Sequence, residues 1–233
     1  ATLQREIEIL KSLQGAEGVV QTYAVGKHKK KSGKEVYSVI MKLYNTQTIR
    51  STEFNLQKLT PDEEVYVARD LMKGLESLHA KKIAHRDLHT SNFVLHREQE
   101  PNTGAVKISC AIADFGEASS FDKAKKATPL VEYSGRFVTP EALIKGKHRV
   151  DVRKVEAFAV GCGLYHLFFG REPSWCEKME HMHVHKLSSK KKKSLSKTLA
   201  REIRQTLDRR KNDLATMTEK HRGLGEVILS LLD

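Results

Sequence analysis

Apolar and polar positions follow two different rhythms over the first 43 residues. Residues 3–13 carry an apolar side chain every three or four positions among charged and amide residues, a spacing that predicts an amphipathic helix. Two runs rich in β-branched residues follow at 19–25 and 36–43, with a polar, glycine-containing stretch at 29–34 between them. Runs joined in this way are typical of a β-hairpin. The beginning of the chain is therefore expected to fold as one helix and a strand pair.

The helical rhythm dominates the rest of the chain. Thr60-Pro61-Asp62-Glu63 combines an N-cap threonine, an early proline and a capping-box glutamate, so a helix is predicted from here to about His79. Residues 155–169 are apolar on almost every face, which indicates a helix buried inside a helical domain. We also predict a strand over 105–113, a helix over 195–214 and a last apolar helix at the end of the sequence.

Composition narrows the class of protein without naming a function. The 233 residues suffice for one large domain or two lobes, and 39% hydrophobic with 30% charged residues is ordinary for a globular protein. The longest apolar run, 157–169, is too short to cross a bilayer, so no membrane span is predicted. Three cysteines without a Cys-x-x-Cys pair argue against a disulfide framework. They favour an intracellular, cytoplasmic location, with the nucleus as the second choice.

The formal net charge of +12 admits several anionic partners. Much of the basic excess lies in two segments, 27–34 and 186–211, which we interpret as solvated loops and helix faces. Nucleic-acid binding through these segments is the less favoured reading. Lys190-Lys191-Lys192-Lys193 is interpreted as part of a solvated linker rather than a docking patch.

Two short motifs in the middle of the chain carry side chains suited to phosphate chemistry. The first is His85-Arg86-Asp87 with Asn92 five positions after the aspartate, and the second is Asp114-Phe115-Gly116. Carboxylate and amide oxygens are the ligands that Mg²⁺ prefers. Moving a phosphoryl group requires such ligands together with a side chain that orients the attacking hydroxyl.

These motifs resemble those of the eukaryotic protein kinase family, and the resemblance covers nearly the whole chain in the family's order. Residues 85–92 look like the catalytic loop, which implies Asp87 as catalytic base and Asn92 as magnesium ligand. Asp114-Phe115-Gly116 is similar to the magnesium motif, which implies Asp114 as a ligand of metal and nucleotide. Thr139-Pro140-Glu141 resembles the tripeptide that closes the activation segment.

The resemblance also assigns the nucleotide side of the site. Arg5-Glu6-Ile7-Glu8-Ile9-Leu10 is similar to the regulatory helix of the small lobe, which implies that Glu6 pairs with an ATP-binding lysine. Met41 stands where the family has its gatekeeper, and Lys42 and Leu43 would lend backbone groups to adenine. The cofactors implied are ATP and Mg²⁺, and the partner implied is a protein substrate phosphorylated on serine or threonine.

The resemblance implies an α+β, bilobal kinase-like fold. Residues 1–43 would form a partial small lobe, and residues 44–233 the hinge and a mainly helical large lobe with a basic insert around 186–211. The glycine-rich phosphate loop and the nucleotide-binding lysine of the family are not among these residues, and we expect a domain truncated at both ends. The alternative is a pseudokinase that acts as a binding or scaffold module.

Three departures from the family pattern lie within the matched region. His89 stands where serine/threonine kinases have a lysine that contacts the transferred phosphate, and we predict that His89 takes over this role. Glu156 replaces the aspartate that caps the catalytic-loop backbone, on an arm longer by one methylene. The spacing between Asn92 and Asp114 exceeds the family norm, and residues 97–104 are predicted to be an inserted hairpin.

The segment from Asp114 to Glu141 contains several hydroxyl residues that bear on specificity and regulation. Ser134 falls where the family's substrate loop touches the catalytic aspartate, which favours serine and threonine over tyrosine substrates. Arg86 is predicted to bind a phosphate added to the loop by a charge-assisted contact. The candidate phosphorylation sites are Ser119, Ser120 and Thr128.

Two further patterns receive an ordinary explanation. His181, His183 and His185 alternate in a way that permits a shared metal ion, but we interpret them as surface histidines because no completing ligand follows at a recognisable spacing. Gly161-Cys162-Gly163 begins like a dinucleotide-binding fingerprint but lies inside a predicted helix. We expect these glycines to permit close helix packing.

Overall fold

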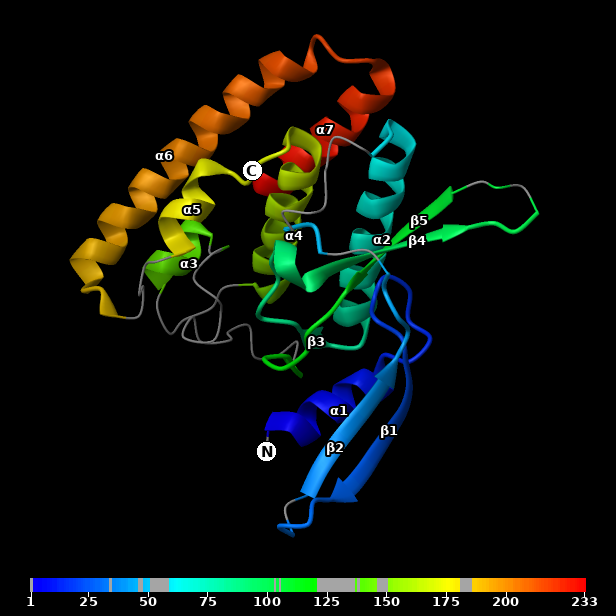
Figure 1. Cartoon of the computed structure of the whole chain (residues 1–233). Helices are drawn as coiled ribbons and strands as arrows, with labels where there is room; N and C mark the ends of the chain where they lie inside the picture. The colour runs from blue at the N-terminus through cyan, green and yellow to red at the C-terminus, as the bar shows by residue number, and fades with distance from the viewer. Residues whose placement is uncertain are drawn as a thin grey trace.

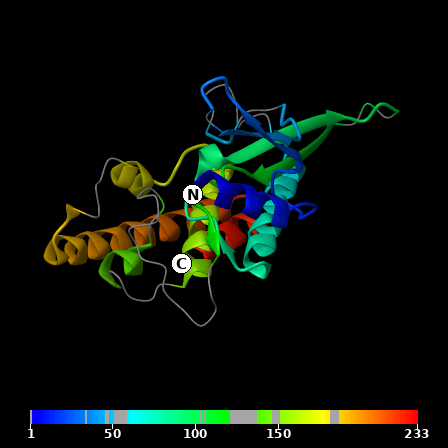
Figure 2. The same cartoon turned by 90° about the horizontal axis from the view of Figure 1, so that it is seen from below.

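The computed structural model describes residues 2–33, 35–45, 48–50, 59–102, 104, 106–120, 137, 139–145, 151–180 and 186–233. Figure 1 shows a small part, with one helix and a two-stranded hairpin at the bottom of the view, and a larger, mostly helical part above it. Figure 2, turned by 90°, shows a second hairpin that reaches out from the larger part. The arrangement matches the predicted α+β class.

The small part consists of helix α1 (Thr2–Ser12) and the antiparallel strands β1 (Thr22–Lys29) and β2 (Glu35–Met41). The apolar face of α1 is buried, so the amphipathic helix predicted over 3–13 is confirmed with its end one residue earlier. The predicted hairpin is also present. Its turn closes through a 2.8 Å hydrogen bond from the Gly33 amide to the Lys30 carbonyl, with Gly33 at φ 79°.

The large part is built from the remaining elements in chain order. They are α2 (Pro61–Ala80), β3 (Ile83–Ala84), the 3-10 helix η2 (Thr90–Asn92), β4 (Phe93–Gln99), β5 (Val106–Ile112), β6 (Ser119–Ser120), α3 (Pro140–Lys145), α4 (Val152–Phe169), α5 (Ser174–Glu180), α6 (Ser189–Leu214) and α7 (Glu219–Leu232). Strand β4 pairs antiparallel with β5, and β3 pairs with β6. The predicted capping box at Thr60 is formed, because the Thr60 side chain accepts from the Glu63 amide while Glu63 Oε2 accepts from the Thr60 amide.

Helix α4 is the centre of the core, as its uniformly apolar sequence predicts. Two glycines in it allow neighbours to approach closely. A Cβ on Gly161 would meet Leu231 Cβ at 2.9 Å, and a Cβ on Gly163 would meet the Phe93 ring at 2.4 Å. Close packing, and not nucleotide binding, therefore explains the Gly161-Cys162-Gly163 pattern. The three cysteines, Cys110, Cys162 and Cys176, are buried as free thiols.

Helix α6 corrects one prediction. The lysines at 190–193, interpreted above as a solvated linker, lie within the first five residues of this 26-residue helix. Ser188 starts the helix by accepting a hydrogen bond from the Lys191 amide, and lysine itself has a favourable helix propensity. The serine cap and the apolar positions further along outweigh the repulsion between the like charges.

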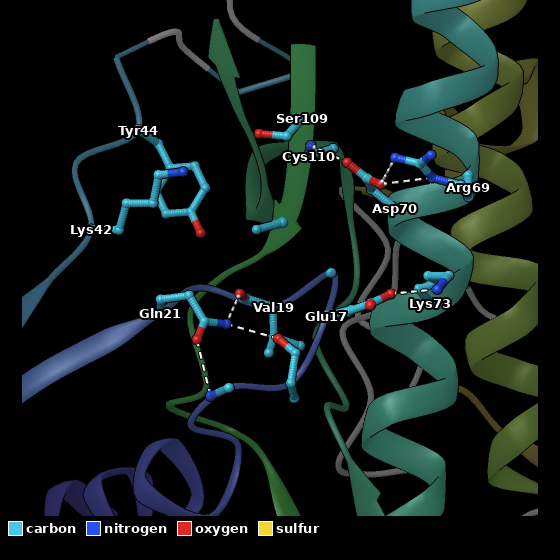
Figure 3. A pocket seen from close by; sticks show the side chains of 14 residues that line it. Glu17, Val19, Gln21, Lys42, Tyr44, Arg69, Asp70, Lys73, Ser109 and Cys110 are labelled. Carbon is cyan, nitrogen blue, oxygen red and sulfur yellow. Dashed lines mark hydrogen bonds and ion pairs between the residues drawn. The ribbon is translucent and has the colours of Figure 1, made fainter. Parts of the chain in front are cut away.

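The loop between α1 and β1 joins the two parts by lying on α2. Gly18 and Gly74 touch so closely that a Cβ on Gly18 would come within 2.2 Å of the Gly74 amide nitrogen. Lys73 forms an ion pair with Glu17, and Asp70 Oδ2 accepts a 3.0 Å hydrogen bond from the Cys110 amide (Figure 3). A cavity of about 520 Å³ lies between this loop, α2 and β5. Its lining includes none of the predicted catalytic or metal-binding residues.

No helix in the described ranges combines the length and apolar character needed to cross a membrane. The described residues also hold no group of three or more His, Cys, Asp or Glu side chains arranged for a metal ion. The alternating histidines at 181–185 lie outside the described residues.

Candidate active site

The catalytic-loop motif lies between β3 and β4 and is folded on itself by Asn92. The Asn92 Nδ2 donates a 2.8 Å hydrogen bond to the Asp87 carbonyl, and the Asn92 backbone amide donates to the His89 carbonyl at 2.8 Å. The Asn92 side chain is buried at 6% exposure, while the Asp87 side chain keeps 26% of its surface exposed. The asparagine is thus locked into the loop, and the aspartate carboxylate remains accessible to a substrate.

His89 lies against the carboxylate of Asp87. Its Nδ1 accepts a 3.3 Å hydrogen bond from the Ser91 amide as the N-cap of η2, which assigns the proton of a neutral ring to Nε2. That Nε2 is 3.4 Å from Asp87 Oδ2 and 3.2 Å from Asn92 Nδ2. The structure therefore brings together the three predicted catalytic residues, with His89 in position to offer a donor beside the base.

Glu156 of helix α4 anchors the loop from below, as its place in the sequence predicts. Its Oε1 accepts hydrogen bonds from the backbone amides of His85, at 2.6 Å, and Arg86, at 2.9 Å. Its Oε2 is 2.8 Å from His79 Nε2 at the end of α2. Glu156 is only 1% exposed, and these three donors satisfy a carboxylate that would be costly to bury alone.

His85 connects the catalytic loop to the Asp114-Phe115-Gly116 segment. Its Nε2 donates to the Ala113 carbonyl at 2.9 Å, its Nδ1 accepts from the Asp87 amide at 3.3 Å, and its ring lies 5.0 Å from that of Phe115. Burial lowers the pKa of His85 below its ordinary value of 6.5, against the opposing effects of Glu156, Asp87 and Asp114. The neutral imidazole is the form that both hydrogen bonds require.

The second motif turns sharply at Asp114, whose φ of 63° is uncommon for a residue with a side chain. Its Oδ1 accepts a 3.3 Å hydrogen bond from the Gly116 amide, and the carboxylate is exposed. Arg86 in the catalytic loop has a similar φ of 72°. Backbone strain of this kind is concentrated at functional sites, where the surrounding contacts hold it in place.

Helix α1 faces the same segment. Burial, followed by the negative charge of Asp114, raises the pKa of Glu6, which places this candidate nucleotide-site residue near Asp114. The preceding Arg5 donates from Nη2 to the Gly116 carbonyl at 3.4 Å. The regulatory-helix candidate is therefore in contact with the magnesium-motif candidate, although the two are more than 100 positions apart in the chain.

The hinge candidates lie at the end of β2, away from the buried core. Met41 is 44% exposed and Leu43 is 78% exposed, so both side chains are open to a ligand. The Lys42 amide is used by the hairpin, since it donates to the Gln21 carbonyl at 2.9 Å. The Lys42 amide is therefore already hydrogen-bonded, and the Lys42 carbonyl is the backbone group of this residue that this bond leaves available to adenine.

Of the segment from Asp114 to Glu141, the structure describes residues 114–120, 137 and 139–141. Arg86 Nη1 donates to Ser119 Oγ at 3.2 Å, so the arginine predicted to bind a loop phosphate already touches one of the candidate hydroxyls. Ser120 belongs to strand β6, and Thr139-Pro140-Glu141 begins helix α3. Thr128 and Ser134 lie outside the described residues, so phosphorylation of Thr128 and the substrate preference read from Ser134 stay predictions.

The donor set fits a magnesium ion. The exposed carboxylate of Asp114 and the amide oxygen of Asn92 are hard oxygen ligands, and the Ala113 amide, next to Asp114, donates to the Asn92 carbonyl at 2.8 Å. Because Asn92 spends its Nδ2 on the Asp87 carbonyl, the amide is oriented by the loop and its Oδ1 is the atom suited to a metal. Among the described residues, Asn92 Oδ1 accepts no hydrogen bond.

Two contacts of the site were missed by reasoning from sequence. Thr90, fully buried, donates from Oγ1 to Glu172 Oε1 at 2.8 Å, which ties the catalytic loop to the segment before α5. His79 completes the hydrogen bonding of Glu156. A buried threonine next to a catalytic loop and a histidine at a helix end are weak signals, because their partners are 82 and 77 positions away.

Comparison with known proteins agrees with this geometry. The family model described as the protein kinase domain matches residues 1–222. Among curated proteins, the serine/threonine-protein kinase PLK4 of Drosophila sechellia is 29% identical over 138 residues, which are 59% of this chain and 16% of that protein. The serine/threonine-protein kinase plk-2 of Caenorhabditis elegans is 28% identical over 178 residues, 76% of this chain and 25% of that protein. The chain thus spans a minor part of the length of these relatives.

A solved structure supports the fold. The crystal structure of the yeast RNA Pol II CTD kinase CTDK-1 complex contains a chain that superposes with a TM-score of 0.59 at 22% identity, covering 74% of this chain and 51% of that one. At this identity the likeness concerns the fold alone. Together with the family match, it confirms the predicted kinase-like fold class.

Proposed function

The chain belongs to the protein kinase domain family, and we propose that it transfers the γ-phosphoryl group of ATP to serine or threonine hydroxyls of protein substrates. The observation that carries this proposal is the catalytic loop. Asn92 and the buried Glu156 hydrogen-bond its backbone, and the carboxylate of Asp87 stays accessible. The names of the curated relatives support serine and threonine as acceptors. The alternative of a pseudokinase gains no support from them.

Each residue has a distinct part in this mechanism. Asp87 accepts the proton of the substrate hydroxyl and orients its oxygen toward the phosphorus. Asn92 and Asp114 would hold Mg²⁺, which when bound offsets the negative charge of the phosphates. Glu156 and His85 keep the loop backbone in place, so that the carboxylate does not have to be ordered at the moment of reaction.

His89 is proposed to contact the transferred phosphate in place of the usual lysine. Its Nε2 lies beside Asp87, where it can donate a hydrogen bond to a phosphate oxygen that approaches the base. In the proposed role, His89→Lys should retain or raise the turnover number, while His89→Ala should lower it by roughly 100- to 1,000-fold, as for the loss of one charge-stabilising donor. Unchanged turnover in His89→Ala would remove this role.

The decisive experiment compares Asp87→Asn with the unchanged protein. Transfer of labelled γ-phosphate to a protein substrate should fall by at least about 100-fold, the usual contribution of a positioned general base. Glu76→Gln, at an exposed position of α2, is the matched control and should keep full activity. Circular dichroism should show the same fold for all three proteins. Equal transfer by Asp87→Asn and the unchanged protein would contradict the proposed function.

We also propose an intracellular location, because the three cysteines are kept as buried free thiols. Fluorescence microscopy of the tagged protein, with cytoplasm and nucleus as the expected compartments, tests this.

A further inference from the structure

Helix α6 presents one face made almost entirely of cations. With 3.6 residues per turn, positions three or four apart lie above one another on a helix. Seven such positions run the length of the exposed face, and six of them are basic; we call these six the basic stripe. Its members are Lys190, Lys193, Lys197, Arg201, Arg204 and Lys211. The seventh position is Asp208. At 1.5 Å per residue, the stripe is roughly 30 Å long.

The charges of the basic stripe do not hold the helix in place. The opposite face of α6 is buried through Leu199, Ile203 and Leu207. Among the described residues, the one ion pair of the stripe joins Lys211 to Asp208 at 4.0 Å. The first turn contains no acidic residue, so the lysines there lie at the positive end of the helix dipole. The stripe therefore costs folding free energy, which points to a use in binding.

The side of α6 that does not carry the stripe packs on α3. Ser196, on the buried side of α6, donates from Oγ to the Pro140 carbonyl at 2.7 Å, and α6 packs along α3. Pro140 belongs to the tripeptide that closes the segment beginning at Asp114. Figures 1 and 2 both show α6 at the edge of the molecule with its outer side turned away from the other helices. The bond from Ser196 therefore fixes the buried side of α6 on α3, and the basic stripe is left on the exposed side of the helix.

The composition of the stripe selects the kind of partner. It contains no aromatic side chain on which a nucleic-acid base could stack. It contains no large apolar side chain that could insert into a lipid surface. A row of cations complements a row of carboxylates, and an extended polypeptide of about nine residues has the length of the stripe at roughly 3.3 Å per residue. A nucleic-acid backbone of equal charge is the competing partner that the binding test has to exclude.

We propose that the basic stripe docks an acidic segment of the protein substrate, so that substrates carrying a run of Asp and Glu are preferred. That the docked polypeptide is a substrate rests on the proposed function. Binding of an acidic polypeptide to the stripe does not depend on catalysis. Electrostatic complementarity of this kind contributes to selectivity and to the rate of encounter, and it weakens as salt is added.

Binding is tested first, with the Asp87→Asn protein and a fluorescent peptide that contains nine consecutive Asp and Glu residues. The variant Lys197→Glu/Arg201→Glu/Arg204→Glu should bind this peptide at least about tenfold more weakly by anisotropy, and should lose the salt dependence. The matched control, Lys29→Glu/Lys30→Glu/Lys31→Glu, makes the same change of charge in the exposed hairpin turn and should bind within about twofold of the parent.

The second measurement compares phosphate transfer to two substrates that differ in an acidic or an amide-containing tail. The stripe variant should raise KM for the acidic substrate with kcat unchanged, and a substrate with a basic tail should restore the low KM. Equal peptide affinity of the stripe variant and the parent would overturn the proposal. So would tighter, stripe-dependent binding of an RNA oligonucleotide of equal charge. If neither substrate is phosphorylated while the peptide still binds at the stripe, the proposed function fails and the docking stands.

Discussion

The catalytic loop and helix α6 both attach to helix α4, but by different kinds of contact. The loop is attached by buried polar groups, above all the carboxylate of Glu156, whose donors lie 2.6 to 2.9 Å away. Helix α6 packs mainly on α3 and α7, and it reaches α4 through Arg210, which lies over the rings of Tyr165 and Phe169. Hydrogen bonds of fixed direction give the loop one geometry, whereas the contacts of α6 leave its outer charges free for a partner.

The largest effect that this difference predicts is the loss of Glu156. Glu156→Ala leaves two buried backbone amides without an acceptor, and each costs about 1–3 kcal/mol. We expect the free energy of unfolding, measured with urea, to fall by about 3–5 kcal/mol and phosphate transfer to fall with it. Glu156→Gln keeps an acceptor and should lose less. The exposed Glu76→Ala should change stability by less than about 0.5 kcal/mol. A loss below 1 kcal/mol in Glu156→Ala would mean that the loop does not depend on this anchor.

The catalytic loop was the easier of the two regions to predict from sequence. Its motif is local, since Asp87 and Asn92 are five positions apart, and a tight loop brings their groups together whatever surrounds them. The Glu156 anchor was also predicted, through the resemblance. The bond from Thr90 to Glu172 was not, because neither residue carries a local signal that names its partner.

Helix α6 was harder to predict from sequence, because its C-terminal part has the apolar spacing of a helix and its N-terminal part does not. The apolar positions from Leu199 onward have helical spacing, but the lysine run before them resembles a solvated linker. The cap at Ser188 was visible in the sequence and would have placed the start of the helix correctly. Local charge repulsion of a few tenths of a kcal/mol per pair is outweighed by burial of the apolar face.

A second test acts on the packing between α4 and the start of β4. In Gly163→Ala the new methyl group would meet the Phe93 ring at 2.4 Å, so Phe93, which directly follows the catalytic loop, has to move. We expect a loss of about 1–3 kcal/mol and lower transfer activity. The control is Gly223→Ala in α7, where a Cβ meets nothing within 4 Å and stability should rise by about 0.5–1 kcal/mol. Changes of the same sign in both variants would contradict the packing argument.

The stability of the catalytic loop should depend on pH through the buried His85, whereas α6 contains no histidine. Burial lowers the pKa of His85 in the folded protein, so the unfolded chain binds a proton more readily as pH falls below 6.5. The contribution of His85 to stability is therefore complete above that pH and is lost as pH falls toward the lower, folded pKa. Protonation would also place a hydrogen on the Nδ1 that accepts from the Asp87 amide. Urea unfolding between about pH 7.5 and 5.5 should show a smaller slope in His85→Asn than in the unchanged protein. Identical slopes would exclude this coupling.

Removing one contact between α6 and α4 should cost less free energy of unfolding than removing Glu156 from beneath the catalytic loop. Arg210 Nε donates to the Tyr165 hydroxyl at 2.8 Å, Nη1 to Asp213 at 2.6 Å, and the guanidinium lies 4.4 Å from the centre of the Phe169 ring. Arg210→Met keeps most of the apolar stem, and we expect a loss of about 1 kcal/mol in the free energy of unfolding. Arg209→Met, at an exposed neighbouring position, should change it by less than about 0.5 kcal/mol. Equal losses would mean that the contacts of Arg210 with α4 do not attach the helix.

The smallest predicted effect is a gain in stability rather than a loss. Lys190 and Lys193 lie near the positive end of the α6 dipole with no acidic residue in the first turn, so Lys190→Glu/Lys193→Glu should stabilise the helix, by about 0.3–1 kcal/mol per position at low salt. Lys211→Glu, at the other end, loses its approach to Asp208 and should destabilise it by a similar amount. Thermal unfolding at low and high salt measures both, and the differences should shrink as salt is added. If the double variant is less stable than the unchanged protein, these lysines support the fold, and the case for the basic stripe as a docking surface loses its physical basis. If it is more stable and also binds the acidic peptide more weakly, the chain keeps these charges at a cost to its own folding.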